Sequence, residues 1–248
     1  MPYATNAGIR IYYEVEGSGT PLVLHHGSFA SGADWRDFGY TEELKRQHRL
    51  LLIDARGHGA SDKPHDHAAY EMALRVSDVT AVLDGLHIEC ANFFGYSMGG
   101  WIGFGLAKHA PTRFRSLILG GAHPFAESFQ GYRDALSGGM TSFVSLVNQA
   151  YGPFMTPDML ARHKANDLDA RLGSSQDRVD FSEVLPGMTM PCLLFAGEDD
   201  PRLSGVRKCA KIIPGAEFFL LPGCGHPAGW YRHDLVLPHV KAFLENVG

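Results

Sequence analysis

Residues 90–109 read CANFFGYSMGGWIGFGLAKH, and this stretch decides how the chain folds. Residues 90–96 form a continuous apolar run of the length expected for a buried strand, whereas residues 98–109 are rich in glycine. The two parts meet at GYSMG, a G-x-S-x-G element centred on Ser97. Flanking glycines let the chain turn sharply from a strand into a helix, which exposes the serine hydroxyl at the turn. The stretch therefore predicts a strand, an exposed nucleophile and a helix, in that order.

Several glycines follow Ser97 within the predicted helix, at positions 99, 100, 103 and 105. Glycine weakens an exposed helix, so an isolated helix would not carry this many. A helix that lacks side chains on one face can, however, approach a sheet very closely. We therefore expect residues 98–109 to press against the central sheet.

The alternation of apolar runs and helix-like stretches continues along the chain. Residues 69–86 and 229–246 place apolar side chains at helical spacing, and residues 8–16 alternate as an edge strand does. Strands that alternate with helices form βαβ units, so we expect an α/β fold with a mostly parallel central sheet flanked by helices. The remaining runs typical of buried strands are 21–26, 49–54, 114–121, 190–197 and 217–222.

Residues 123–186 break this rhythm, because they contain many apolar side chains but no convincing strand. A structureless loop of about 60 residues is uncommon in a compact domain, so we interpret this segment as a small helical cap. The cap would be inserted into one core domain formed by residues 1–122 and 187–248. An insertion at the carboxyl ends of the strands would cover the ligand site, and some aromatic side chains would then face the substrate. The candidates for substrate contact are Phe29, Phe125 and Phe143.

A serine hydroxyl is not nucleophilic at neutral pH without a base, so Ser97 requires a nearby histidine. His226 is the best candidate, because it ends the glycine-rich loop PGCGH just after the last predicted strand. His25 and His123 also follow predicted strands and are the alternatives. Of the three, His226 fits the expected chain order of nucleophile, acid and histidine.

The histidine in turn requires a carboxylate that fixes its tautomer and stabilises the imidazolium. The sequence GEDDP at residues 197–201 supplies three carboxylates at the end of the penultimate predicted strand. We assign Asp200 as the acid and keep Asp199 as the alternative. Glu198 is expected to point away or to cap the turn.

Hydrogen-bond donors are needed for the negative charge that develops on a substrate carbonyl oxygen. One donor is expected to be the backbone N–H of Met98, directly after the nucleophile. The other is expected from the loop HGSF that follows the strand at 21–26. We assign the N–H of Ser28, because Gly27 allows the tight approach that such a loop requires.

These segments together resemble the α/β-hydrolase superfamily over essentially the whole chain. In that superfamily the carboxylate of a GxxD element is the triad acid, which supports Asp200. The chain is similar to the small esterases, enol-lactonases and cofactor-free haloperoxidases that carry a compact cap. The matching pieces are His26-Gly27 with Trp35 eight residues beyond the glycine, DARGHGAS at 54–61, the turn at Ser97, GEDD at 197–200 and Gly225-His226.

The residues and the resemblance together imply a serine hydrolase that cleaves a carboxylic ester or a lactone with small to medium apolar groups. Ser97 would attack the carbonyl, His226 would move the proton and Asp200 would orient the histidine. The same residues would serve a perhydrolase or haloperoxidase, a C–C bond hydrolase or a thioesterase, so these alternatives stay open. A non-catalytic ligand receptor on this scaffold is a further alternative. We expect an ester or lactone as the small-molecule partner and no cofactor.

Composition and charge exclude other function classes. The chain has 248 residues, a formal net charge of −5 and no basic run, so we expect no nucleic-acid and no membrane partner. We find no secretory signal, and the cysteines lack C-x-x-C spacing. We therefore expect a cytoplasmic protein with reduced thiols and no metal site, and we interpret His65-Asp66-His67 as a solvated loop. A homo-oligomer stays an open alternative.

Overall fold

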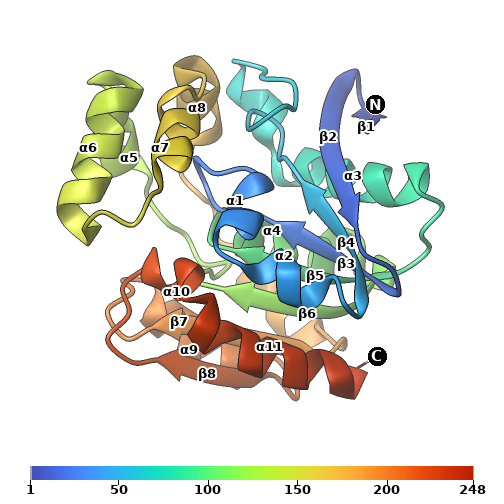
Figure 1. Ribbon diagram of the computed structural model, residues 1–248. Helices are drawn as coiled ribbons and strands as arrows, with labels where there is room; N and C mark the ends of the chain where they lie inside the picture. The colour runs from blue at the N-terminus through green and yellow to red at the C-terminus, as the bar shows by residue number, and fades with distance from the viewer. Residues whose placement is uncertain (1, 248) are drawn as a thin grey trace.

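An eight-stranded sheet runs through the centre of the protein, with helices on both faces (Figure 1). The computed structural model describes residues 2–247. The strand order is β1-β2-β4-β3-β5-β6-β7-β8; the pairs β1–β2 and β2–β4 are antiparallel, and the other pairs are parallel. The strands are β1 (Tyr3–Asn6), β2 (Ile9–Glu16), β3 (Thr20–His25), β4 (His48–Ile53), β5 (Ala91–Tyr96), β6 (Phe114–Gly120), β7 (Cys192–Gly197) and β8 (Glu217–Leu221). The expected mostly parallel central sheet is confirmed.

The helices fall between the strands, as the alternation of the sequence predicts. Within residues 2–247, no helix has the length and hydrophobicity that crossing a bilayer needs. The helices are α1 (Ala33–Asp37), α2 (Tyr40–Leu44), α3 (Met72–Gly85), α4 (Met98–His109), α5 (Gln130–Leu136), α6 (Gly139–Tyr151), α7 (Pro157–Lys164), α8 (Leu168–Ser174), α9 (Leu203–Ile212), α10 (Ala228–Tyr231) and α11 (His233–Val247), with 3₁₀ helices η1 (His67–Tyr70), η2 (Pro111–Arg113) and η3 (Ser182–Gly187).

Two hydrophobic cores lie on opposite faces of the sheet, because successive residues of a strand point to opposite sides. On β5, Phe93 packs in the core that includes residues of α3, α4 and α9. Phe94 packs in the other core, with residues of α1, α2 and α11. On β6, Leu119 packs in the same core as Phe93, and Ile118 packs in the same core as Phe94. Since both faces are covered, the central strands are apolar throughout, which explains their continuous hydrophobic runs in the sequence.

Helix α4 lies in backbone contact with the sheet, as its glycines predict. A Cβ atom added at Gly99 would lie 2.1 Å from the carbonyl oxygen of His25 on β3, and one at Gly103 would lie 2.2 Å from Leu119 Cδ2. A Cβ at Gly95 would lie 2.4 Å from the carbonyl oxygen of Gly99. These glycines are therefore required by close packing around the turn between β5 and α4.

Several elements differ from the sequence-based expectation; among them, α1, α2 and α9 had no predicted range. The short edge strand β1 was not predicted, and it pairs with β2, so the strand expected at the edge over residues 8–16 lies inside the sheet. The helix expected at 69–86 is divided into η1 and α3, and the helix expected at 229–246 is divided at Arg232 into α10 and α11. Edge strands and short helices of one or two turns carry too few residues for a clear periodicity.

Helices α5 to α8 occupy the long connection between β6 and β7 and lie together beside the sheet (Figure 1). They share a small hydrophobic cluster that includes Leu136, Met140, Phe143 and Val144. Phe29, from the loop after β3, packs in the same cluster. We call α5 to α8 the cap helices; the division of the chain at residues 123 and 186 stays a prediction.

Replacing Gly99 with alanine should lower the free energy of unfolding by about 2–3 kcal/mol, because the new Cβ would collide with a backbone carbonyl that cannot move freely. Gly85→Ala is the matched control, since a Cβ at that helix position meets nothing within 4 Å. It should leave stability unchanged or raise it by up to about 1 kcal/mol. Denaturant unfolding of both variants measures the difference, and equal stabilities would contradict the close packing of α4.

Candidate active site

Ser97 occupies the turn between β5 and α4 in a strained backbone conformation. Its φ is 53° and its ψ is −109°, a combination that non-glycine residues rarely adopt. The turn is fixed by a hydrogen bond from the Ser97 N–H to the Gly120 carbonyl at 2.8 Å. At Gly27, an added Cβ would lie 3.4 Å from Ser97 Cβ, so the loop after β3 also approaches closely. The hydrogen bond fixes the turn that presents the hydroxyl, and the loop after β3 lies next to it.

His226 lies in the loop between β8 and α10 and faces Ser97. Its Nε2 is 2.9 Å from Ser97 Oγ, within hydrogen-bond distance. The phenol of Tyr96 donates a hydrogen bond of 2.5 Å to the His226 carbonyl, and burial raises the pKa of Tyr96 well above its usual value. The phenol therefore keeps the proton it donates. Tyr96 thus joins the nucleophile turn directly to the histidine loop.

Asp200 follows β7 and completes the hydrogen-bonded set. Its Oδ2 accepts a hydrogen bond of 2.7 Å from His226 Nδ1, and its Oδ1 accepts one of 2.9 Å from the Arg202 N–H. Burial by itself would raise the pKa of Asp200, but the hydrogen bond and the imidazole outweigh it, so the pKa lies below its usual value. A proton on Nδ1 leaves the Nε2 lone pair to accept the Ser97 proton.

The structure brings Asp200, and not the alternative Asp199, to the histidine. Asp199 is exposed, and Asp200 is only 4% exposed. Glu198 accepts a hydrogen bond from the Gly223 N–H at 3.0 Å, which agrees with a capping role at the turn. The other candidate histidines lie elsewhere. His25 is buried, which lowers its pKa to about 3, and His123 packs against Gly205 of α9.

Arg202 donates its backbone N–H to Asp200, and the sequence analysis did not identify this residue. Its side chain is buried and forms an ion pair with Glu127, a residue at the start of the long connection. Glu127 also pairs with Arg178 at 3.2 Å. Burial opposes the charge of Arg202, but Glu127 and Asp200 raise its pKa above the usual value. No sequence pattern links residues 127 and 202, because their contact exists only after folding.

The expected oxyanion donors are the backbone N–H groups of Ser28 and Met98. Within residues 2–247, neither the N–H of Ser28 nor that of Met98 makes a hydrogen bond. Ser28 lines the same cavity as Ser97 and His226, and Met98 is the first residue of α4. The N-terminus of a helix favours negative charge, which suits an oxyanion near Met98.

A cavity of about 110 Å³ opens beside Ser97 and His226. Phe29 and Phe143, two of the expected substrate contacts, line it. Phe125 does not, and this expectation is corrected: its ring packs against α9, with Lys208 Nζ 4.2 Å from the ring centre. Phe125 lies in the segment that connects β6 to the first cap helix, α5, and this segment runs beside α9. Other apolar residues of the wall are Phe38, Tyr132, Val144, Val147, Tyr151, Phe154, Met155 and Trp230.

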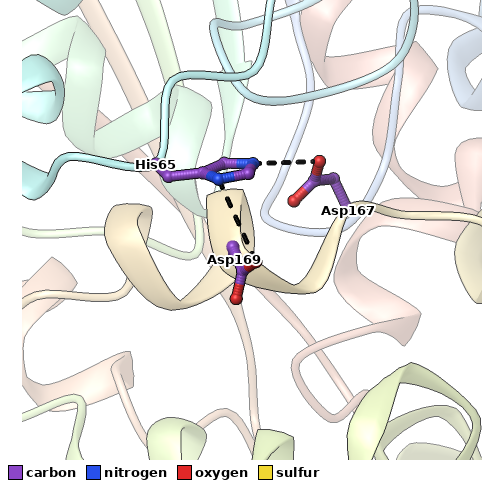
Figure 2. A group of neighbouring side chains, drawn as sticks. All are labelled: His65, Asp167 and Asp169. Atoms are coloured by element: carbon purple, nitrogen blue, oxygen red, sulfur yellow. Dashed lines mark hydrogen bonds and ion pairs between the residues drawn. The ribbon is translucent and has the colours of Figure 1, made fainter.

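A separate group of side chains, His65, Asp167 and Asp169, brings three potential metal ligands within 4.8 Å of one another (Figure 2). His65 Nε2 lies 3.2 Å from Asp167 Oδ2, and its Nδ1 lies 3.9 Å from Asp169 Oδ2. Asp167 also caps α8 by accepting a hydrogen bond from the Ala170 N–H. The His65 side chain is 56% exposed. Its contacts with Asp167 and Asp169 therefore form a solvent-exposed polar link between the loop that contains His65 and the start of α8.

Comparison with known proteins agrees with this architecture. A 2-hydroxy-6-oxononadienedioate/2-hydroxy-6-oxononatrienedioate hydrolase from Paraburkholderia phymatum is 30% identical over 90% of this chain and 86% of its own. A non-heme haloperoxidase from Rhodococcus erythropolis is 26% identical over 99% of this chain and 100% of its own. The crystal structure of the enol-lactonase from Burkholderia xenovorans LB400 superposes with a TM-score of 0.87 at 25% identity, covering 98% of this chain and 100% of that one.

The family model described as alpha/beta hydrolase fold matches residues 20–159, which is more than half of the chain. This segment contains the loop after β3, the turn at Ser97 and the first cap helices. The chain therefore belongs to the α/β-hydrolase fold family of hydrolases.

Proposed function

We propose that the protein is a serine hydrolase that cleaves a carboxylic ester or a lactone with small to medium apolar groups. The observation that carries this proposal is the hydrogen-bonded set of Asp200, His226 and Ser97, with links of 2.7 Å and 2.9 Å. This order of contacts is the one that activates a serine for acyl transfer. The apolar wall of the adjacent cavity supports an apolar acyl or alcohol group.

In the proposed reaction, Ser97 Oγ attacks the substrate carbonyl carbon while His226 Nε2 takes the hydroxyl proton. The anionic Asp200 stabilises the imidazolium, and the N–H groups of Met98 and Ser28 bind the carbonyl oxygen as it becomes negative. The C–O bond of the ester breaks and His226 gives its proton to the departing alcohol. A water molecule, deprotonated by His226, then attacks the acyl carbon. The bond from this carbon to Ser97 Oγ breaks, Oγ takes the proton back from His226, and the acid is released.

A C–C bond hydrolase that uses the same three residues is the second candidate. It is favoured by the relative from Paraburkholderia phymatum, which has the highest identity among the near full-length comparisons above. Thioesters and peracid formation are further reactions of the same nucleophile. A panel of esters, lactones, thioesters, diketones and hydrogen peroxide separates these activities, and turnover of esters or lactones above the others is the result that we expect.

Replacing Ser97 with alanine should reduce the turnover of a nitrophenyl butyrate by on the order of 10⁵-fold or more, because no other group can form the acyl-enzyme. Initial rates of nitrophenol release measure this loss. Ser18→Ala, at an exposed turn between β2 and β3, is the control and should keep the wild-type rate. Wild-type turnover by Ser97→Ala would rule out the proposed nucleophile.

Replacing Asp200 with asparagine should reduce kcat by about 10⁴-fold, because an amide cannot hold the productive tautomer of His226 or stabilise its charge. Asp199→Asn is the matched control, since it changes the exposed neighbouring carboxylate in the same way. Its activity should stay close to that of the wild type. A larger loss in Asp199→Asn than in Asp200→Asn would overturn the assignment of the acid.

A further inference from the structure

Besides His226 of the reacting set, the lining of the active-site cavity contains one carboxylate and one further imidazole. They are Asp34 on α1 and His163 on cap helix α7. His163 Nε2 lies 3.2 Å from Asp34 Oδ1, so the pair joins the core to the cap. Asp34 is 1% exposed, which makes it a buried carboxylate beside a site whose other walls are largely apolar.

The remaining contacts of Asp34 fix its role as an acceptor. Its Oδ2 accepts hydrogen bonds from the Ser31 N–H at 2.7 Å and from the Ser31 hydroxyl at 3.1 Å. Its Oδ1 also lies 3.5 Å from the guanidinium of Arg162. Burial would raise the pKa of Asp34, but the contacts with His163 and Ser31 outweigh it and lower the pKa. An ionised Asp34 can only accept, so the His163 Nε2 carries the proton that it donates.

The other ring nitrogen of His163 is left for a ligand. Within residues 2–247, His163 Nδ1 makes no hydrogen bond, and it is not among the enclosed polar atoms that lack a partner. The side chain is 12% exposed and lines the active-site cavity. When the ring carries one proton, on Nε2, its Nδ1 has a lone pair and can accept a hydrogen bond.

His163 also lies where the active-site cavity meets a second cavity of about 420 Å³. Phe29, Ala30, Asp34 and His163 line both cavities. The second cavity is more polar, with Glu14, Asp54, Lys63 and Asn166 in its wall. A substrate held at Ser97 by its carbonyl would therefore extend along apolar walls and reach a polar boundary at His163.

We propose that the Asp34–His163 pair is a polar subsite that binds a hydrogen-bond donor of the substrate, a hydroxyl or an amide N–H, at a distance from the scissile carbonyl. This inference rests on the proposed function and specifies its substrate class. A purely apolar substrate would cover Nδ1 and leave it without a partner, which costs binding energy. His163 is thus a specificity-determining residue, whereas the reacting groups remain Ser97 and His226, with Asp200 orienting the histidine.

Matched substrates test this subsite. Nitrophenyl esters of a series of ω-hydroxyalkanoic acids are each paired with the alkanoate in which a methyl group replaces the hydroxyl. At the chain length that reaches His163, the wild type should prefer the hydroxy ester in kcat/KM by about tenfold, which corresponds to about 1.4 kcal/mol. His163→Phe, which removes the acceptor but keeps a ring, should abolish the preference. His163→Gln, which restores an acceptor oxygen, should recover part of it.

His65→Phe is the matched control, because His65 Nε2 also lies 3.2 Å from a carboxylate, that of Asp167, outside the lining of either cavity (Figure 2). It should keep the wild-type preference. The inference is overturned if the wild type prefers no hydroxy ester at any length, or if His163→Phe keeps the preference. If His163→Phe does not fold, the inference is still overturned by a wild type without the preference or by a His163→Gln variant with the full wild-type preference.

A separate binding measurement distinguishes failure of the subsite from failure of the proposed function. Calorimetry with Ser97→Ala should show that the ω-hydroxyalkanoic acid binds about tenfold more tightly than the matched alkanoic acid, without any turnover. If the wild type hydrolyses no ester but this difference appears, the proposed reaction fails and the subsite stands. If esters are hydrolysed and the two acids bind equally, the subsite fails and the reaction stands.

Discussion

The strained turn at Ser97 is the constraint on which the rest of the structure depends. A non-glycine residue in such a conformation costs about 1–3 kcal/mol and persists only where its surroundings hold it. The contact of Gly99 with the His25 carbonyl and the hydrogen bond to Gly120 supply this restraint. The other groups of the site follow the carboxyl ends of nearby strands, so the parallel sheet brings them to the same edge.

The core and the long connection between β6 and β7 contribute different properties to the site. The proposed nucleophile, histidine, acid and oxyanion donors all belong to loops or helix ends of the core, whereas many apolar walls of the cavity belong to the cap helices. Contacts that join these parts close to the site include the ion pair of Arg202 with Glu127 and the hydrogen bond of His163 with Asp34. Changes in the cap can therefore alter substrate choice while the reacting groups stay in place.

Sequence reasoning predicted the central strands, the close packing of α4 and the residues that meet at Ser97, because each has a local signal. Buried parallel strands are apolar throughout, and the turn at Ser97 has its own glycine pattern. Arg202, Glu127 and His163 carry no such signal, since each acquires its role from a partner far along the chain. Phe125 was misplaced for the same reason: an aromatic residue is expected to pack against other apolar groups, but the path of the chain decides which groups these are. The choice between Asp199 and Asp200 likewise needed the geometry of the turn after β7.

The central claim is that Ser97 becomes covalently acylated, and trapping that intermediate tests it most directly. The enzyme is mixed with an excess of an activated ester, quenched in acid within the first turnovers, digested and analysed by mass spectrometry. The account predicts that the acyl group is found on the peptide that contains Ser97 and disappears as the substrate is consumed. An acyl group on another residue, such as the buried Cys224, or hydrolysis without any covalent intermediate, would contradict it.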